Sequence, residues 1–236
     1  MHRWTKAAPI RQMQIESGTD ITFNNVFLPY YDALLNDSNF ASIIDIGCGT
    51  GHLTKILSAY GARVVGIDPS KGMADTASKV VGDKATILCT AIENYSGAES
   101  FDLAISHLCL HTTIQIDNFL GCVKRILNPS GLFIFSIPHP CFWNNYKRCV
   151  PTDAFNYMDT IEVEATLTIT KDRVNEMIVP YVHRPLSSYF CSLAKVGFTV
   201  QNFDEIFPST DIQALYGSPW YEPRYVVFKV MLPKKT

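Results

Sequence analysis

A glycine-rich loop is the first feature of this sequence that could do chemistry. It runs from Asp45 to Gly51 with the letters DIGCGTG, directly after an apolar run. Glycines at alternate positions allow a backbone to turn tightly and to approach a ligand closely. Asp68 lies 17 residues after Gly51, at the end of the next apolar run, where its carboxylate can accept hydrogen bonds from a ribose diol. The loop and Asp68 together predict a binding site for a nucleoside-containing ligand.

The spacing of the glycines distinguishes between two classes of cofactor. A dinucleotide-binding loop has the form G-x-G-x-x-G and places pyrophosphate at a helix N-terminus. Here Gly51 comes one residue early, and His52 occupies the place of the third glycine. Asp45 adds a carboxylate before the loop, which suits a ligand with an ammonium group better than a ligand with two phosphates. The loop therefore favours S-adenosylmethionine over NAD, and an NAD-type enzyme is the less favoured alternative.

Together with two later segments, the loop resembles the class I S-adenosylmethionine-dependent methyltransferases. These segments are Gly66–Met73 (GIDPSKGM) and Phe101–Ser106 (FDLAIS), and the resemblance is strong over residues 40–137. It implies a methyltransferase of the small-molecule type with S-adenosylmethionine as its cofactor. The cofactor-binding residues that the resemblance implies are Asp45, Gly47, Cys48, Gly49, Gly51, Asp68, Pro69, Met73, Thr90, Ala91, Ile92, Ser106 and His107.

The resemblance also implies what the main members of this set do. The three loop glycines would hold the methionine moiety of the cofactor, with Asp45 at its amino group and residues 106–107 at the same end. Asp68 would bind the ribose hydroxyls, and Met73 would pack near the adenine. Thr90 stands where the family often has an aspartate. The family's usual side-chain contact to the adenine amino group is therefore not expected in the same form.

Two histidines are candidates for catalytic chemistry with the methyl acceptor. Methyl transfer from a sulfonium is an in-line displacement that can be accelerated mainly by holding the reacting atoms at near-attack distance in a dry pocket. A general base is needed only for an acceptor such as an alcohol, a phenol or a protonated nitrogen, and histidine is the usual base. His139 lies between two prolines after the fifth apolar run, and His111 ends the segment after the fourth. The alternatives are a structural role for His139 and packing or shaping of the cofactor site for His111.

The segments around these residues alternate between apolar runs and helical spacing. Five apolar runs lie between residues 43 and 137, and each predicts a strand. The helix before the fifth run is expected to end at residues 128–131, and the fifth run covers residues 132–137. The helix after the glycine loop is expected to extend to Gly61. Strands that are apolar throughout are covered on both faces, which predicts a parallel sheet with right-handed crossovers. The predicted fold class is α/β, a Rossmann-like, doubly wound, mainly parallel seven-stranded sheet with an antiparallel last strand and an inserted lid hairpin.

We expect a single methyltransferase domain over residues 1–236. Its expected parts are an N-terminal helical cap (1–40), the cofactor-binding half (41–137), a lid or substrate insertion (138–185) and a C-terminal helix with strands (186–236). The insertion is expected to contain a hairpin because apolar and polar side chains alternate from Ile161 to Ile169, before a turn at 171–172. Aromatic residues in the insertion suit a flat or apolar acceptor, and local packing explains them equally well.

Composition limits the partners of this chain. Twenty basic and 22 acidic side chains give a net charge of −2, which disfavours a nucleic-acid partner. Hydrophobic residues make up 47% of the 236 residues, as in a folded globular chain. Seven cysteines without a C-x-x-C pair argue against a disulfide scaffold, and no signal peptide or membrane span is evident, so we expect a cytoplasmic protein. The expected partner is a small-molecule acceptor, with no membrane, nucleic acid or metal, and the expected state is a monomer or homodimer.

Two other functions remain open from the sequence. The acceptor could be a protein or a nucleic acid, although Ser106–Cys109 replaces the base-flipping motif that nucleic-acid methyltransferases carry after the fourth strand. Alternatively, the chain could bind S-adenosylmethionine without catalysis, because methyl transfer has no obligate catalytic side chain whose loss would be visible. The sequence identifies neither the acceptor nor the atom that is methylated.

Overall fold

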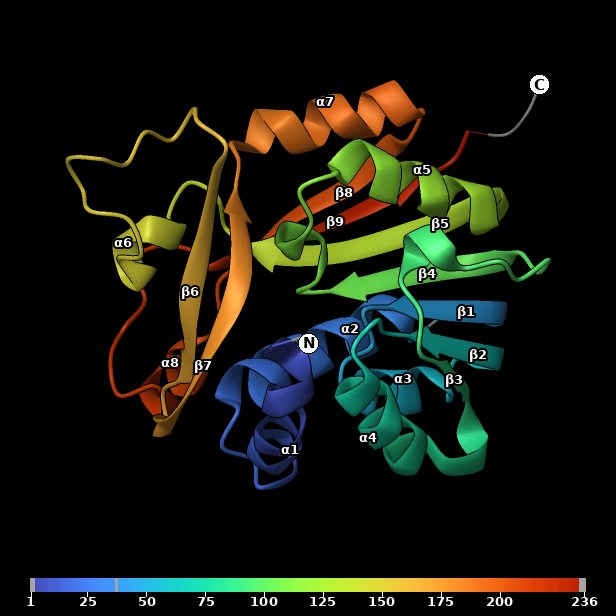
Figure 1. Ribbon diagram of the computed structural model, residues 1–236, viewed down its shortest axis with the longest axis horizontal. Coiled ribbons are helices and arrows are strands. Elements are labelled where there is room, and N and C mark those ends of the chain that lie inside the picture. The colour runs from blue at the N-terminus through green and yellow to red at the C-terminus, as the bar shows by residue number, and fades with distance from the viewer. Residues whose placement is uncertain (1–2, 37, 234–236) are drawn as a thin grey trace. The chain divides into compact units, whose positions relative to one another are not determined.

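The computed structural model describes residues 3–36 and 38–233 of the chain (Figure 1). The chain divides into two compact units. The first unit comprises residues 1–91, 166–179 and 208–221, and the second comprises residues 92–165, 180–207 and 222–236. Each unit therefore combines a continuous stretch of chain with segments from further along the sequence.

The first unit contains the N-terminal helices and three strands. Its elements are α1 (Arg3–Glu16), η1 (Thr22–Phe27), α2 (Leu28–Leu35), β1 (Phe40–Ile46), α3 (His52–Leu57), β2 (Gly61–Ile67), α4 (Lys71–Val81), η2 (Gly82–Lys84), β3 (Thr86–Leu88) and α8 (Thr210–Leu215). Strand β2 pairs in parallel with both β1 and β3. The three carboxyl ends consequently lie at one edge, where parallel sheets bind their ligands.

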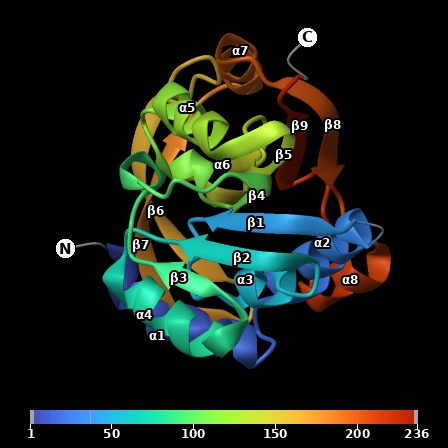
Figure 2. The ribbon, with the colours of Figure 1, turned by 90° about the vertical axis from the view of Figure 1, so that its right-hand side faces the viewer.

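Helix α1 packs directly against α4, as both ribbon views show (Figures 1 and 2). A Cβ atom at Gly72 would lie 2.7 Å from the carbonyl oxygen of Thr5, so only glycine permits this approach. The side chain of Ser70 accepts a hydrogen bond from the backbone N–H of Met73 and caps the start of α4. Met73 then joins the apolar cluster that Ala7 and Met177 also form. Burial of this cluster holds α1 in place.

The second unit contains the other strands of the main sheet. Its elements are η3 (Ile92–Asn94), β4 (Phe101–His107), η4 (Leu110–Thr112), α5 (Ile116–Ile126), β5 (Leu127–Pro138), α6 (Trp143–Lys147), α7 (Leu186–Val196), β8 (Thr199–Ile206) and β9 (Tyr225–Met231). Strand β5 pairs in parallel with β4 and antiparallel with β9, which also pairs antiparallel with β8. The rings of Phe135 and Phe228 stack at 4.7 Å across β5 and β9 and form part of the core.

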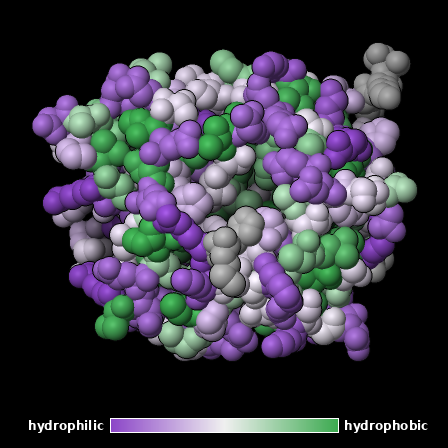
Figure 3. Space-filling model, in the orientation of Figure 1, coloured by the Kyte–Doolittle hydropathy of each residue, from purple (hydrophilic) through white to green (hydrophobic). Residues whose placement is uncertain are grey.

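The strand order confirms the predicted fold class. The main sheet has seven strands in the order β3-β2-β1-β4-β5-β9-β8. A separate two-stranded sheet is the predicted hairpin, β6 (Ile161–Ile169) and β7 (Asp172–His183). On the face shown in Figure 3, hydrophilic side chains are interspersed with smaller groups of hydrophobic ones. None of the helices in the described part of the chain combines the length and the apolar character needed to cross a membrane.

Several predicted boundaries were wrong for local reasons. Helix α3 ends at Leu57, and Gly61 begins β2, where a Cβ atom would lie 2.7 Å from Cδ1 of Ile43. Residues 128–131 lie within β5, and a register shift between Phe101 and Leu103 on β4 accommodates them. Helices α6 and α8 have five and six residues, which is too short for a helical period to be recognised in the sequence.

Candidate functional site

The backbone of the glycine loop has the conformation that requires glycine. Gly47, Gly49 and Gly51 have φ angles of 74°, 54° and 79°, in the left-handed region. A Cβ atom at Gly51 would lie 2.8 Å from Cα of Ala77 on α4, so the loop also needs glycine for close packing. At Gly49 a Cβ atom would meet nothing within 4 Å, which leaves space for a ligand beside the backbone.

Asp68 ties this loop to the start of α4. Its Oδ2 accepts a hydrogen bond from the backbone N–H of Gly49 at 3.0 Å, and its Oδ1 accepts one from the N–H of Ser70 at 2.8 Å. The N–H groups of Gly47 and Cys48 both donate to the carbonyl oxygen of Ile67, at 2.8 and 3.0 Å. Because each carboxylate oxygen has a second lone pair, Asp68 can still accept a hydrogen bond from a ligand hydroxyl.

Asp45 is a buried carboxylate with one oxygen unsatisfied. Thr54 donates to its Oδ2 at 2.6 Å, whereas its Oδ1 has no hydrogen-bond partner among the described residues. Burial raises the pKa of Asp45 to about 7, against the lowering effect of the Thr54 hydrogen bond, and the nearby carboxylate of Asp68 adds to the increase. An unsatisfied buried carboxylate oxygen is best stabilised by a cationic donor such as an ammonium group.

Most of the predicted cofactor residues lie in the first unit, at or after the carboxyl ends of β1, β2 and β3. They are Asp45, Gly47, Cys48, Gly49, Gly51, Asp68, Pro69, Met73, Thr90 and Ala91. The side chain of Cys48 faces Gly66, because a Cβ atom there would lie 3.2 Å from the Cys48 Sγ. Thr90 donates through its hydroxyl to the carbonyl oxygen of Ala91 at 3.2 Å.

The remaining three predicted cofactor residues lie in the second unit. Ile92 is buried in η3, and Ser106 and His107 end β4. The hydroxyl of Ser106 is buried without a hydrogen-bond partner among the described residues. Nδ1 of His107 lies 2.9 Å from the hydroxyl of Ser136, which also accepts from the N–H of Leu108 at 3.0 Å. This network fixes the turn that follows β4.

His139 has both ring nitrogens engaged. Its Nδ1 accepts a hydrogen bond from the backbone N–H of Cys141 at 3.2 Å, and its Nε2 lies 2.7 Å from Oε1 of Glu205. Because Nδ1 acts as an acceptor, the network assigns the proton to Nε2, which donates to Glu205. His139 is 1% exposed. Of the two roles considered for His139, this geometry favours a structural one.

His111 has a free ring nitrogen. The residue is buried in η4, its ring centroid lies 5.2 Å from that of Tyr181, and its Nδ1 has no hydrogen-bond partner among the described residues. Burial lowers the pKa of His111 to about 3, and the positive charge of Arg184 and the nearby His107 act in the same direction. The imidazole is therefore neutral at physiological pH, so one of its nitrogens can accept a hydrogen bond.

Two further candidates lie outside the predicted site set: Arg184, to which the sequence-based reasoning gave no role, and His183, for which it favoured a solvated or hairpin-packing role. Arg184 is 3% exposed, and its Nη2 donates to the carbonyl oxygens of Thr113 and Ile114, whereas its Nη1 has no partner among the described residues. Nε2 of His183 lies 3.0 Å from the carbonyl oxygen of Tyr157, and its Nδ1 has no hydrogen-bond partner in the described part of the chain. The HRPL run at 183–186 was visible in the sequence, but its burial was not.

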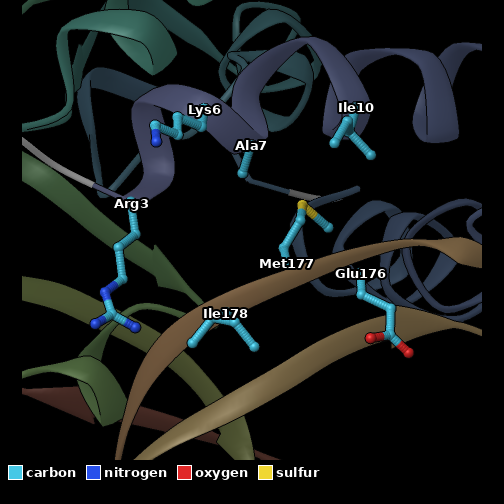
Figure 4. Close-up of a pocket in the computed structure, with 7 residues that line it drawn as sticks. All are labelled: Arg3, Lys6, Ala7, Ile10, Glu176, Met177 and Ile178. Atoms are coloured by element: carbon cyan, nitrogen blue, oxygen red, sulfur yellow. The ribbon is translucent and has the colours of Figure 1, made fainter.

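A cavity of about 290 Å³ lies in the first unit, beside α1. Figure 4 shows Arg3 and Lys6 projecting from α1 and Glu176 from β7. The remaining lining residues are Ala7, Ile10, Met177 and Ile178. No residue of the predicted cofactor set lines this cavity, although Met73 belongs to the same apolar cluster as Ala7 and Met177.

Comparison with known proteins places the loop in a family context. Residues 44–135 match the protein family described as a methyltransferase domain. The ubiquinone biosynthesis O-methyltransferase of Bradyrhizobium diazoefficiens is 34% identical over 98 residues, which cover 40% of this chain and 38% of that protein. The malonyl-[acyl-carrier protein] O-methyltransferase of Priestia megaterium is 36% identical over 104 residues, 40% of this chain and 36% of that protein. The match thus spans less than half the length of these curated relatives.

Solved structures resemble the chain over most of its length. A putative S-adenosylmethionine-dependent methyltransferase from Listeria monocytogenes has a TM-score of 0.66 and 23% identity, covering 86% of this chain and 95% of that one. An S-adenosylmethionine-dependent methyltransferase from Clostridium acetobutylicum has a TM-score of 0.65 and 19% identity, covering 97% and 98%. These similarities show the fold.

Proposed function

We propose that this chain, which has the fold and the cofactor loop of the class I S-adenosylmethionine-dependent methyltransferases, transfers a methyl group from S-adenosylmethionine to a small-molecule acceptor. The observation that carries the proposal is the left-handed glycine loop next to the unsatisfied carboxylate oxygen of Asp45. The names of the two curated relatives, both O-methyltransferases, support oxygen as the methylated atom, with nitrogen as the alternative.

The residues of the first unit fit the cofactor. Oδ1 of Asp45 is suited to the ammonium group of its methionine part, and Asp68, fixed by hydrogen bonds from the N–H groups of Gly49 and Ser70, is suited to the ribose hydroxyls. The open space beside Gly49 admits a ligand against the backbone. Met73 provides an apolar side chain for the adenine. When bound, S-adenosylmethionine supplies an electrophilic methyl group on a positively charged sulfur.

His111 suits an acceptor. His111 is neutral, so its free Nδ1 can accept a hydrogen bond from the hydroxyl or amine of the acceptor and orient its nucleophilic atom. A histidine whose pKa is this low holds a proton poorly, so His111 contributes orientation more than proton storage. His139 acts indirectly, as a positioning residue, because its hydrogen bonds to Cys141 and Glu205 fix the turn after β5.

Isothermal titration with S-adenosylhomocysteine tests the cofactor assignment. We expect the wild-type chain to bind it and Asp68→Ala to weaken binding at least tenfold. Asp83→Asn is the matched control, because Asp83 is an exposed carboxylate of the same unit outside the predicted set. Absence of binding to S-adenosylmethionine and S-adenosylhomocysteine, or full affinity in Asp68→Ala, would overturn the assignment.

A screen with methyl-labelled cofactor tests the transfer. Small phenols, carboxylic acids and amines are offered as acceptors, and label is followed into each product. Label that enters only added protein or nucleic acid would establish a macromolecular acceptor instead. Cofactor binding without transfer to any acceptor class would establish a non-catalytic binding protein.

A further inference from the structure

Three unpaired polar atoms are buried together in the second unit. They are Nδ1 of His111, Nδ1 of His183 and Nη1 of Arg184, none of which has a hydrogen-bond partner among the described residues. His111 comes from η4, whereas His183 and Arg184 follow one another between β7 and α7. Buried polar groups in folded proteins are normally paired, so three unpaired atoms in one region indicate that a partner is missing.

Arg184 carries a buried charge without a counter-ion. Its Nη2 donates to two backbone carbonyl oxygens, and its guanidinium lies 5.7 Å from the ring centroid of Tyr189. No ion pair among the described residues includes Arg184. A guanidinium cannot lose its proton at physiological pH, so the charge persists, and the carbonyl oxygens and the Tyr189 ring offset only part of its desolvation.

The groups around Arg184 do not supply a negative charge. Burial raises the pKa of Tyr181 and of Tyr189, so both phenols are neutral. Burial and the positive charge of Arg184 both lower the pKa of His111. Burial is also the main cause that lowers the pKa of His183, and Arg184 adds to this decrease, whereas the hydrogen bond to the Tyr157 carbonyl and the carboxylate of Asp159 act in the opposite direction. Arg184 is thus a buried positive charge that these phenols and imidazoles do not neutralise, and it favours a ligand with a negative charge.

Flat aromatic surfaces adjoin the unpaired atoms. The ring of Trp143 stacks on Tyr181 with centroids 3.9 Å apart and planes 7° apart. Tyr181 in turn contacts His111, and Phe155 lies edge-on to His183 at 4.9 Å. These rings make the surroundings of Arg184 apolar, and a carboxylate suits the planar guanidinium fork. A phosphate dianion would leave one negative charge without a partner.

We propose that Arg184 binds the acceptor through Nη1, and that the acceptor of this methyltransferase carries a carboxylate. This inference rests on the proposed function and narrows its substrate class. Nδ1 of His111 then faces the part of the acceptor that holds the nucleophilic atom. Arg184 selects for acids over their neutral analogues, because an amide leaves the guanidinium charge unpaired.

Binding of benzoate and benzamide tests this proposal. The two probes differ in charge but have nearly the same shape, and each is titrated by calorimetry into the full-length protein saturated with S-adenosylhomocysteine. We expect benzoate to bind at least tenfold more tightly than benzamide. This comparison uses only the wild-type chain, so it holds even if every Arg184 variant fails to fold. Equal affinities would overturn the proposal.

The variants Arg184→Gln and Arg125→Gln test whether the preference for benzoate depends on Arg184. Arg125 is an exposed arginine of the same unit and serves as the matched control. We expect Arg184→Gln to lose the preference for benzoate while keeping its affinity for S-adenosylhomocysteine, and Arg125→Gln to behave as wild type. Retention of the preference in Arg184→Gln would overturn the proposal. A loss of affinity for S-adenosylhomocysteine in this variant would also overturn it, because Arg184 would then serve the carboxylate of the cofactor.

Turnover gives an independent readout. With 3,4-dihydroxybenzoate and its amide as paired acceptors, we expect the wild-type kcat/KM to favour the acid at least tenfold, mainly through KM, and Arg184→Gln to show a ratio near one. Wild-type chain that binds benzoate but not S-adenosylhomocysteine would contradict the proposed function and leave the anion site standing. Wild-type chain that binds S-adenosylhomocysteine but not benzoate would contradict the anion site and leave the proposed function standing.

Discussion

Raising the pH from 6 to 8 should tighten the binding of S-adenosylhomocysteine through the ionisation of Asp45. Burial raises the pKa of this carboxyl to about 7 in the free protein, so the group is mostly protonated at pH 6 and mostly ionised at pH 8. The ammonium group of the ligand pairs only with the ionised form. Binding therefore removes a proton at low pH, and affinity increases as the pH rises through 7.

The magnitude follows from the ionised fraction. With a pKa of about 7, roughly 9% of Asp45 is ionised at pH 6 and roughly 91% at pH 8, a ratio of about ten. That ratio corresponds to about 1.4 kcal/mol of binding free energy. Above pH 8 the contribution of Asp45 levels off, and below pH 6 it falls about tenfold per pH unit.

Calorimetry in buffers of different ionisation enthalpy measures both the affinity and the protons released. We expect about 0.9 proton released from Asp45 at pH 6 and about 0.1 at pH 8. Asp45→Asn should bind weakly and lose this dependence, and the comparison cancels the ionisation of the ligand itself. Asp83→Asn should retain it. The same slope in wild type and Asp45→Asn would show that Asp45 does not meet the ammonium group, and the reasoning would be refuted.

Three further outcomes are expected. Because the folded-state pKa of Asp45 is raised from 3.8 to about 7, its stabilising contribution is complete below about pH 4 and is lost as the pH rises through 7, by up to about 4 kcal/mol. Thermal unfolding of the ligand-free chain should therefore show a melting temperature that falls from pH 5 to pH 8 in wild type and less steeply in Asp45→Asn; parallel curves would contradict this. Gly51→Ala should cost about 2–3 kcal/mol in urea unfolding, because its φ is 79° and the added Cβ meets backbone at 2.8 Å, whereas Gly18→Ala, with φ of 72° and open space, should cost about 1 kcal/mol. Equal costs would show that the packing of the loop is not tight. His139→Ala should lower kcat while the Kd for S-adenosylhomocysteine stays within about twofold of wild type, as measured by turnover and calorimetry; comparable losses in both would place His139 beside the cofactor.

The sequence predicted those features that depend on neighbouring residues. Apolar runs and the glycines of the loop are local signals, and the left-handed φ angles of Gly47, Gly49 and Gly51 show why glycine is required there. The environment of His139 could not be predicted, because Glu205 lies 66 residues away in the sequence. The sequence shows the two prolines beside His139, but it does not show that both ring nitrogens are used in hydrogen bonds.

Buried charge was the least predictable property of the candidate site. Arg184 is held by carbonyl oxygens from residues 113–114, some 70 positions earlier in the chain. Whether such an arginine is solvated or buried depends on which distant segments fold around it, and periodicity in the sequence carries no such information. The unsatisfied Oδ1 of Asp45 is a similar case, because the hydrogen bond from Thr54, on the helix after the loop, goes to Oδ2 instead.

The two unsatisfied charges have opposite signs and call for different ligands. Among the described residues, Oδ1 of Asp45 has no donor and Nη1 of Arg184 has no acceptor, so neither satisfies the other. An ammonium group would stabilise the first and a carboxylate the second, and the methionine end of the cofactor carries both groups. Binding data therefore have to distinguish two cases: either the cofactor alone satisfies both residues, or the cofactor satisfies Asp45 and the acceptor satisfies Arg184. If the carboxylate belongs to the acceptor, Asp45→Asn weakens only S-adenosylhomocysteine, Arg184→Gln weakens only benzoate, and the double variant shows each loss unchanged. If one zwitterion satisfies both residues, both variants weaken S-adenosylhomocysteine, and their effects are coupled through the same bound molecule.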